Sequence, residues 1–544
     1  MDMVGRMVDR LLGLAPAPVA DIEVWRGLRV PMPEGAVLLA DRYAPADAGP
    51  MPVVLVRGPY GRGGFWGAVF GGVLARQGLQ VLVQSVRGTF GSEGVFDAMH
   101  QERADGLATA AWVRAQPWCD GRLAGAGLSY LGYTQWALAP YLDPPLHAAC
   151  LAITASEFNS HHYPGGAFNL YDALSWTVQI GRQEDVSPLR GQIDPVQQRR
   201  TRRAEAHLPL RGADTVALGR PSKFWQDVVA HAEPGDGYWA AADHSPAVAR
   251  LTTPVTMATG WYDLFLPWQL RDFRTLREAG RTARVTIGPW AHSDPPALRA
   301  DIRDQVQWLR AHLLGDALPG SPAVRAYLQH ADRWLEFAEW PPAATRPTPL
   351  YLHPGGALDW QPAPASEPDS FVYDPSDPTP SVGGPLLDGR NRQRDNRPVE
   401  ARPDVLVYTS APLPRDLDLM GDVSAAVHVR TEVPHADVYV RLCDVDTRGV
   451  SRNISDGILR LRPGAAPVAA DGTVTAAVGM WPTGYRLRAG HRLRVQVAGG
   501  AFPRFARNHG TGEPVADAVT MRPCRHEVHH DPAHPTHLLL PVLG

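Results

Sequence analysis

The chain has 544 residues, of which 44% are hydrophobic and 20% are charged, and its formal net charge is −3. This length and composition predict a globular protein of several domains. The small net charge and the lack of long basic or acidic runs argue against nucleic acid or a membrane surface as the main partner. Lys223 is the only lysine, and it follows Ser222 instead of a glycine. A phosphate-binding loop ending in Gly-Lys-Ser/Thr is therefore excluded.

Three features bear on the compartment in which the protein works. The stretch LLGLAPAPVA (11–20) follows Asp2 and Asp9 and is interrupted by prolines, so it is a poor secretory signal. No apolar run approaches the roughly 20 residues that a membrane span requires. The four cysteines are far apart and form no Cys-x-x-Cys pair, which is typical of reduced, mostly buried thiols. We therefore expect a cytoplasmic protein.

The first 156 residues alternate between buried strands and helices. Apolar runs bounded by Gly or Pro predict strands over 52–58 and 79–86, and an amphipathic pattern predicts a helix over 102–116. Two further apolar runs, 122–127 and 148–156, predict more strands. This alternation indicates a mainly parallel sheet with helices on both faces.

Residues 157–245 break this pattern, because they are first aromatic and irregular, then polar and helical, with no convincing strand. They predict a helical insertion. The alternation then resumes with a predicted strand, helix, strand and helix over 253–260, 267–280, 283–290 and 302–315.

Beyond about residue 349 the chain consists of short alternating runs separated by Pro, Gly, Asp and Asn, which predict a β-sandwich or jelly roll. Within this part, we expect the Pro- and Asp-rich stretch 362–385 to be a surface loop. The predicted fold class is α/β, with a C-terminal β domain. The predicted boundaries are 1–156 and 246–348 for the two parts of the α/β core, 157–245 for the helical insertion and 349–544 for the β domain.

The stretch GAGLSYLGYTQW (125–136) places Ser129 between a predicted strand and a predicted helix. That is the position of the nucleophile elbow of α/β hydrolases, usually spelled Gly-x-Ser-x-Gly. Here Leu131 stands where the second glycine is usual, and Gly132 follows one residue late. On this stretch alone, an ordinary glycine-rich turn remains the alternative.

Each of the next two predicted core strands is followed by a residue that completes a catalytic triad, first Asp263 and then His292. The order Ser…Asp…His, at the carboxyl ends of parallel strands, is that of α/β hydrolases. His292 would take the proton of Ser129, and Asp263 would orient the imidazole. Asp294 is a competing acid, but we expect a loop carboxylate there because it lies only two residues from His292.

An oxyanion hole would stabilise the tetrahedral intermediate. The residue after the nucleophile, Tyr130, normally supplies one backbone N–H. No run of the His-Gly-Gly-Gly type supplies a second donor. Tyr60, in RGPYGRGG (57–64), carries a hydroxyl that could donate, although the residues alone favour an exposed loop tyrosine.

Several motifs occur in a fixed order along the chain: RGPYGRGG, SVRGTFGSEG, QPWCDGRLAGAGLSYLGYTQW, YPGGAF, GWYDLF, GPWAHSD and FPRFARNHGTG. From about residue 22 to 540 the chain resembles the bacterial cocaine esterase-like (CocE/NonD) hydrolases. These are related to Xaa-Pro dipeptidyl-peptidases, α-amino acid ester hydrolases and glutaryl cephalosporin acylases. The family spells its elbow Gly-x-Ser-Tyr-x-Gly, so the late glycine fits. The resemblance implies an α/β-hydrolase core with an inserted helical cap and a C-terminal jelly-roll domain.

The resemblance also implies site residues, each at a matching position of this chain. It implies the same triad, and it places the hydroxyl of Tyr60 beside the N–H of Tyr130 in the oxyanion hole. Trp176 and Phe265 correspond to aromatic residues that line the acyl pocket.

Other matches to the family are looser. Trp261 and Tyr262 belong to a family motif but are expected to pack as structure. Where the esterase has a tryptophan, this chain has His161 or His162, which puts a pocket shaped for a benzoyl group in doubt.

The predicted function is cleavage of carboxylic esters through an acyl-serine intermediate. Two alternatives stay open: an amide-cleaving relative (Xaa-Pro dipeptidyl-peptidase, β-lactam acylase or α-amino acid ester hydrolase) and a catalytically silent binding protein. No carboxylate cluster for a substrate amine can be assigned. The expected partner is a small ester or amide, and a homo-oligomer is compatible with the sequence.

No cofactor is predicted. The stretch GAGLSY has Tyr130 where a dinucleotide fingerprint needs its third glycine. The histidine-rich segment CRHEVHHDPAHPTH (524–537) has metal-binding residue types. Because this segment corresponds to the last loop and strand of the family, we expect no metal there.

Overall fold

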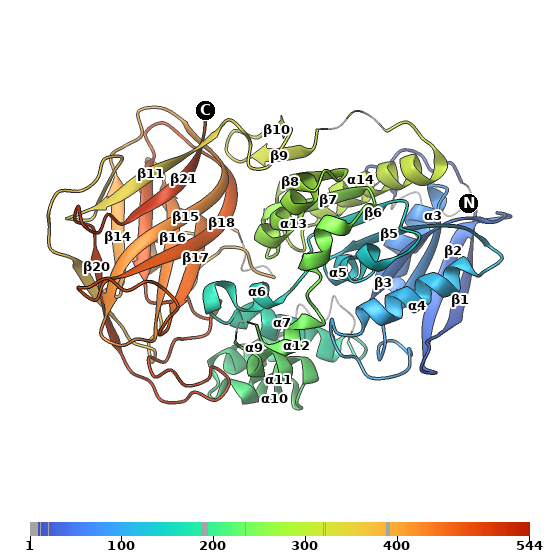
Figure 1. The fold of residues 1–544 in the computed structure, drawn as a ribbon, viewed down its shortest axis with the longest axis horizontal. Coiled ribbons are helices and arrows are strands. Elements are labelled where there is room, and N and C mark those ends of the chain that lie inside the picture. Colours follow the sequence, from blue (N-terminus) through green and yellow to red (C-terminus); the bar gives the residue numbers. More distant parts are fainter. Residues whose placement is uncertain are drawn as a thin grey trace.

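The computed structural model describes the chain in segments, namely residues 9–10, 12–19, 21–186, 194–233, 235–318, 320, 322–387 and 392–544. It has an N-terminal α/β domain and a C-terminal β-rich domain, and a group of helices lies against both (Figure 1). Residues 11 and 20 of the N-terminal stretch considered as a signal fall outside the described segments. Within those segments, no helix combines the length and apolar character that a membrane crossing requires.

Ten strands form the sheet of the α/β domain, in the order β1-β2-β4-β3-β5-β6-β7-β8-β9-β10. Their bounds are β1 (Ile22–Pro31), β2 (Val37–Pro45), β3 (Met51–Gly58), β4 (Gln80–Ser85), β5 (Cys119–Leu128), β6 (Ala149–Ala152), β7 (Val255–Tyr262), β8 (Ala283–Ala291), β9 (Val324–Leu328) and β10 (Arg333–Phe337). From β4 to β9 all neighbours are parallel, whereas β1, β2 and β10 join antiparallel at the edges. Every residue of β4 and β7 is buried, as expected for parallel strands covered on both faces.

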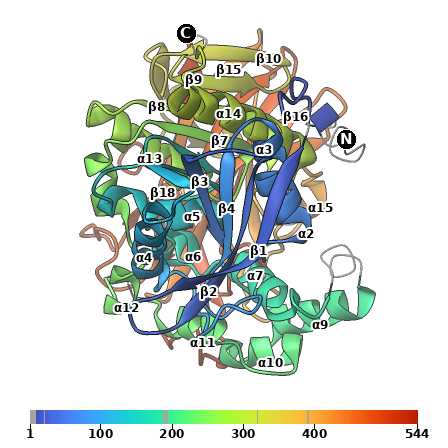
Figure 2. The same ribbon diagram turned by 90° about the vertical axis from the view of Figure 1, so that its right-hand side faces the viewer.

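Helices cover both faces of this sheet (Figure 2). They are α2 (Gly64–Trp66), the π-helix Gly67–Val73, α3 (Leu74–Arg76), α4 (Glu102–Arg114), α5 (Tyr130–Trp136), α13 (Leu266–Glu278) and α14 (Pro295–Leu314). Side chains of a strand alternate between the two faces. Accordingly, Val53 and Leu55 of β3 pack in one core with α4, α5 and α13, and Val54 and Val56 pack in another with α14 and the π-helix.

The segment between β6 and β7 is helical, and it contains no strand in its described residues. Its α-helices are α6 (Asn159–His162), α7 (Leu170–Arg182), α9 (Pro195–Ala206), α10 (Ala213–Leu218), α11 (Lys223–Ala230) and α12 (Gly237–Ala240). They gather at one end of the α/β domain, next to the β-rich domain (Figure 1). We call residues 157–245 the helical segment.

The β-rich domain contains eleven paired strands. They are β11 (Thr345–His353), β12 (Ala357–Asp359), β13 (Asp369–Tyr373), β14 (Val405–Ser410), β15 (Leu417–Thr431), β16 (Ala436–Val445), β17 (Ser451–Leu461), β18 (Val474–Leu487), β19 (Arg492–Ala498), β20 (Cys524–His529) and β21 (His537–Leu543); a short helix, α15 (Arg397–Glu400), precedes β14. The prediction that 362–385 is entirely a loop is wrong. β13 lies within it and pairs antiparallel with β20, because Phe371 and Tyr373 alternate into the core.

The two domains are joined by hydrogen bonds as well as by packing. The N–H of Gln329, just after β9, donates to the carbonyl of Gly484 in β18 at 3.0 Å. The indole N–H of Trp481, also in β18, donates to the backbone carbonyl of Asp263 at 3.1 Å. Strand β18 therefore contacts the α/β domain where β7 and β9 end.

Candidate active site

Ser129 stands on a sharp turn between β5 and α5. Its backbone has φ 54° and ψ −126°, outside the regions that residues with a side chain normally occupy. The N–H groups of Gly132 and Tyr133 both donate to the Ser129 carbonyl at 3.0 Å, and the N–H of Ser129 donates to Ala152 in β6. These bonds hold the strained backbone, so the serine hydroxyl projects from the carboxyl end of the sheet.

The glycines around the serine explain why the late spelling of the elbow works. A Cβ atom on Gly127 would lie 2.3 Å from the backbone of Leu131, and one on Gly132 would lie 2.7 Å from the side chain of Thr154. The Leu131 side chain occupies space beside Gly58, where a Cβ atom would come within 2.5 Å of it. The turn therefore needs glycine at 127 and 132, while position 131 has room for leucine.

Ser129, His292 and Asp263 form a continuous hydrogen-bonded chain. His292 Nε2 lies 3.0 Å from Ser129 Oγ, and His292 Nδ1 lies 2.7 Å from Asp263 Oδ2. Asp263 is fully buried, and its other oxygen accepts from the N–H of Phe265 at 2.7 Å. Both carboxylate oxygens thus have donors, which fixes the carboxylate against the imidazole.

Asp294, the competing acid, faces away from this chain. Its Oδ2 accepts from the backbone N–H of Ala291 at 2.6 Å and forms an ion pair with Arg392 of the β-rich domain. It is also the N-cap residue of α14. The geometry therefore gives the role beside His292 to Asp263.

Two donors face the space in front of Ser129. As the first residue of α5, Tyr130 has an N–H that no carbonyl within the helix can accept. The hydroxyl of Tyr60 contacts Ser129 and accepts a hydrogen bond from the indole N–H of Trp176 at 3.1 Å. Burial raises the pKa of Tyr60 to about 12, so this hydroxyl keeps its proton at neutral pH. With its oxygen already accepting, the hydroxyl is oriented to donate.

The side chain of Tyr130 anchors the elbow to the sheet. Its hydroxyl donates to Glu102 Oε1 at 2.9 Å and accepts from the N–H of Met99 at 2.8 Å. Glu102 in turn pairs with the buried Arg57 at 3.1 Å. Sequence reasoning missed this buried network, because its members come from three separate elements.

The cavity in front of Ser129 is walled by aromatic side chains from several elements. Trp176 of α7 stacks on Tyr130 with ring centroids 5.7 Å apart and meets Phe224 of α11 edge-on at 4.5 Å. Phe265 packs edge-on against His292 at 5.5 Å. Six of the seven predicted site residues line this cavity, and the seventh, Asp263, lies behind His292.

Two adjacent histidines, His161 and His162, also line this cavity. Both are at the end of α6 and buried, and neither Nδ1 atom has a hydrogen-bond partner. Burial lowers the pKa of His162 to about 3, and burial together with His162 and His292 lowers the pKa of His161 well below its usual range. Both imidazoles are therefore neutral at pH 7. One of these two imidazoles stands where the family resemblance implies a tryptophan. This wall of the cavity is therefore partly polar.

Asp172 and Leu387 also line the cavity and were not singled out from the sequence. The N–H of Leu387, from the β-rich domain, donates to Asp172 Oδ1 at 2.9 Å. Burial raises the pKa of Asp172 to about 6, although that N–H and the amide of Asn169 act in the opposite direction. Asp172 lies one helical turn before Trp176, a spacing that could have placed it on the same face of α7.

Trp261 and Tyr262 lie outside this cavity lining. Trp261 donates to the carbonyl of Tyr327 at 2.7 Å, and Tyr262 donates to Gln329 at 2.7 Å. A second, wider recess lies between β8 and α14 and is lined in part by Arg303 and Trp334, but its lining contains no serine, cysteine or histidine. The chemistry therefore belongs to the cavity at Ser129.

Comparison with known proteins agrees with this arrangement. The sequence profile of X-Pro dipeptidyl-peptidase (S15 family) matches residues 34–294, and that of the X-Pro dipeptidyl-peptidase C-terminal non-catalytic domain matches residues 318–539. Cocaine esterase from Rhodococcus sp. (strain MB1 Bresler) is 32% identical, over 94% of this chain and 97% of that protein.

Solved structures share the whole fold. An aminopeptidase from the marine sediment archaeon Thaumarchaeota archaeon superposes with a TM-score of 0.81 at 21% identity, covering 97% of this chain and 98% of that chain. An α-amino acid ester hydrolase has a TM-score of 0.79 at 21% identity, with the same coverage. The protein is thus an enzyme that hydrolyses esters or peptides. More narrowly, the chain belongs to the cocaine esterase-like (CocE/NonD) hydrolases, as its motifs predict.

Proposed function

We propose that the protein is a serine esterase that cleaves carboxylic esters through an acyl-serine intermediate. The observation that carries this proposal is the chain of contacts from Asp263 through His292 to Ser129, at 2.7 and 3.0 Å, at the base of an apolar cavity. Membership of the cocaine esterase-like hydrolases supports an ester as the substrate.

The residues of the site divide the steps of this reaction among them. Ser129 Oγ attacks the ester carbonyl carbon while His292 Nε2 takes its proton, and Asp263 stabilises the imidazolium that forms. The Tyr130 N–H and the Tyr60 hydroxyl donate to the oxyanion. His292 then gives its proton to the departing alcohol, and a water molecule activated by the same imidazole hydrolyses the acyl-serine.

The cavity favours an uncharged acyl group. Its walls are aromatic, both histidines are neutral at pH 7, and no arginine or lysine is among the described lining residues. The two imidazoles add hydrogen-bonding atoms to a wall that is mainly aromatic. Small alkyl or aromatic acyl groups, with room for one polar substituent near His161 or His162, fit this lining.

We also propose that the helical segment is a cap and that the β-rich domain is a jelly roll, with the boundaries 1–156, 157–245, 246–348 and 349–544. The support is that α6, α7 and α11 contribute His161, Trp176 and Phe224 to the cavity wall, while the α/β domain contributes the nucleophile.

Amide cleavage is the second candidate function, because the S15 peptidase profile covers the residues that form the triad. Asp172 is the one carboxylate among the described lining residues, and it already accepts from Leu387 and Asn169. It is therefore a poor site for a free substrate ammonium group, which favours the ester.

The test is hydrolysis of p-nitrophenyl acetate, butyrate and benzoate beside an Xaa-Pro anilide, with the wild type and Ser129→Ala. We expect ester turnover that falls by about 10⁴–10⁶ in the variant, as for other serine nucleophiles. Labelling by a fluorophosphonate, read by mass spectrometry, should also disappear. Ser245→Ala, at a half-buried turn of the helical segment outside the cavity lining, is the matched control and should behave as the wild type. Ester turnover that persists in Ser129→Ala, or cleavage of the anilide alone, would contradict the proposal.

A further inference from the structure

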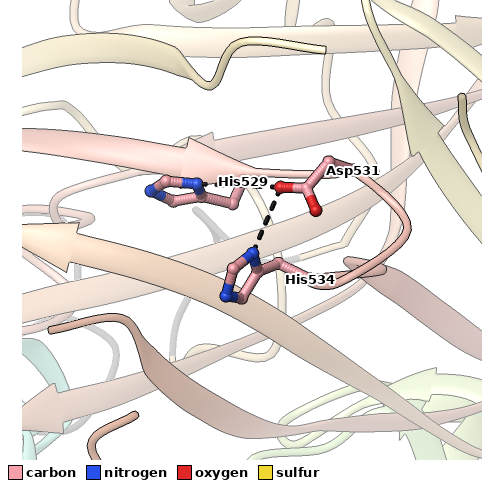
Figure 3. A group of neighbouring side chains, drawn as sticks. All are labelled: His529, Asp531 and His534. Carbon is pink, nitrogen blue, oxygen red and sulfur yellow. Dashed lines mark hydrogen bonds and ion pairs between the residues drawn. The ribbon is translucent and has the colours of Figure 1, made fainter. Parts of the chain in front are cut away.

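The histidine-rich segment 524–537 folds into a compact polar group in the β-rich domain. His529 ends β20, and Asp531 and His534 lie in the loop that leads to β21; the three side chains converge (Figure 3). One nitrogen or oxygen atom from each lies within 4.8 Å of the other two, and no other such group of His, Cys, Asp or Glu occurs in the described part of the chain. The expectation of no metal rested on sequence position and could not anticipate this convergence.

Asp531 stands between the two imidazoles. Its Oδ2 lies 3.1 Å from His534 Nδ1 and 3.9 Å from His529 Nδ1. Its Oδ1 is occupied, because it accepts from the backbone N–H of Ala533 at 2.8 Å. The bond from Ala533 to Oδ1 therefore orients the carboxylate of Asp531 so that its Oδ2 faces both imidazole rings.

His534 has a carboxylate at each ring nitrogen. Its Nε2 lies 3.0 Å from Asp471 Oδ2, on the connection between β17 and β18, and the other oxygen of Asp471 accepts from the N–H of Thr473. A neutral imidazole has only one N–H. If Nε2 donates to Asp471, the lone pair of Nδ1 faces the carboxylate of Asp531 at 3.1 Å. The Nδ1 lone pair and the Asp531 carboxylate are both acceptors, so a cation must lie between them, either a second proton or a metal ion.

The arrangement at His534 is the one that metal-binding histidines use. A ligating imidazole usually donates its other N–H to a carboxylate, which fixes the tautomer and the ring orientation. Asp471 stands in that position. Nδ1 of His529 offers a third ligand atom for a metal ion. The other ring nitrogen of His529, Nε2, is buried without a hydrogen-bond partner. The ring of His529 therefore has no competing polar contact in the described structure.

The loop that carries the group is closed by its own hydrogen bonds. The hydroxyl of Thr536 donates to the carbonyl of His529 and accepts from the N–H of His428 in β15 at 2.9 Å. The ends of the loop are therefore fixed before any ion binds. The three ligand side chains are each 13–21% exposed, which leaves an open side for an ion and its water.

We propose that His529, Asp531 and His534 bind one divalent transition-metal ion, with Zn²⁺ the ion that this donor set suits best. Two imidazoles and one carboxylate are common zinc ligands, and water completes four-coordination. The two carboxylates, Asp531 and Asp471, balance the charge of the ion. The site is structural: it ties the β20–β21 loop, through His534 and Asp471, to the β17–β18 connection. It is independent of the proposed esterase activity.

The experiment is titration of the full-length, EDTA-treated and dialysed protein with Zn²⁺, followed by calorimetry and by metal analysis after gel filtration. We expect one Zn²⁺ per chain with a Kd below about 10 μM. His534→Ala should weaken binding by at least about 100-fold, and Asp471→Asn, which removes the outer carboxylate, by about 10-fold or more. Titration with Co²⁺ should give the visible absorption of a four- or five-coordinate ion.

Controls separate a built site from surface binding. His312→Ala, on α14 of the α/β domain, should bind Zn²⁺ as the wild type does. Asp531→Asn is nearly isosteric, so it tests the site even if His534→Ala does not fold, and circular dichroism checks the fold of each variant. Binding that is unchanged in both Asp531→Asn and His534→Ala would show an adventitious ion only. A wild type that binds no Zn²⁺ tighter than about 100 μM would overturn the proposal.

Discussion

The proposed catalytic centre and the wall of the cavity in front of it are built in different ways. Ser129, Asp263 and His292 all follow strands of one parallel sheet, β5, β7 and β8, so backbone pairing sets their spacing. The wall combines side chains of the helical segment with Leu387 of the β-rich domain and with Tyr60, Tyr130 and Phe265 of the α/β domain. These parts meet through contacts between separate segments, such as Leu387 to Asp172. The comparison teaches that the reaction is specified by one sheet, whereas selectivity depends on how separate parts of the chain pack together.

Asp263→Asn should have the largest effect, because it acts inside the sheet-built centre. An asparagine amide would favour the wrong imidazole tautomer and remove the charge that stabilises the imidazolium. We expect kcat for p-nitrophenyl butyrate to fall by about 10⁴, with KM nearly unchanged. Asp294→Asn is the matched control and should stay within about threefold, because its carboxylate accepts from the N–H of Ala291 and pairs with Arg392 instead of contacting His292. Equal losses in both variants would contradict the assignment of the acid.

Tyr60→Phe tests the point where the centre and the wall meet, since the Tyr60 hydroxyl contacts both Ser129 and Trp176. Loss of one oxyanion donor should lower kcat by about 10²–10³. Because the pKa of Tyr60 is about 12, the hydroxyl remains a donor and the ratio of wild type to variant should stay constant from pH 7 to about 10. Tyr327→Phe, on β9, is the control. A loss below about threefold would mean that another group supplies the second donor.

His162→Gln probes the wall alone and should have the smallest effect on turnover, but it should change the response to acid. The pKa of His162 is about 3 in the folded protein, below its ordinary value of 6.5, so the unfolded chain binds a proton between these values that the folded chain does not. Stability from this residue is therefore present above pH 6.5 and is lost as the pH falls. Between pH 7 and 4.5 the wild type should lose about 2–3 kcal/mol more unfolding free energy than the variant.

Urea unfolding at the two pH values, with His312→Gln as the control, measures this difference. Buried carboxyls with raised pKa values, such as Asp172, act with the opposite sign but are common to both proteins and cancel in the comparison. An equal loss in wild type and His162→Gln would show that His162 titrates normally and that the wall is open to water.

The contrast between centre and wall also decides what could be predicted from the sequence. The triad and elbow could be predicted from the sequence because each of their residues directly follows a strand with a strong apolar pattern, and the structure brings these residues into contact. Tyr60, Trp176 and Phe265 were placed only through the family resemblance. Leu387 and Trp481 carry no local signal, since they reach the site from another domain through packing.

The fold followed the same rule. Strands β3, β4, β7 and β8 lie within one or two residues of their predicted positions because they are continuous apolar runs between turn residues. The predicted strand 148–156 ends already at Ala152, where Ile153 adopts φ 40° and the chain leaves the sheet. Helix α14 begins at Pro295 instead of residue 302; Asp294 and two prolines are a start signal that the apolar pattern alone did not reveal.

The hydrogen bond from Trp481 to the carbonyl of Asp263 has a consequence for thermal inactivation of the enzyme. The backbone of Asp263, the proposed catalytic acid, is thus supported by strand β18 of the β-rich domain. That domain matches a family domain described as non-catalytic. Activity would therefore be lost when the two domains first separate, before either domain unfolds. The half-life of activity at raised temperature would report the lifetime of that contact. Engineering for thermal stability would therefore begin at the domain interface around Trp481 instead of in the two hydrophobic cores.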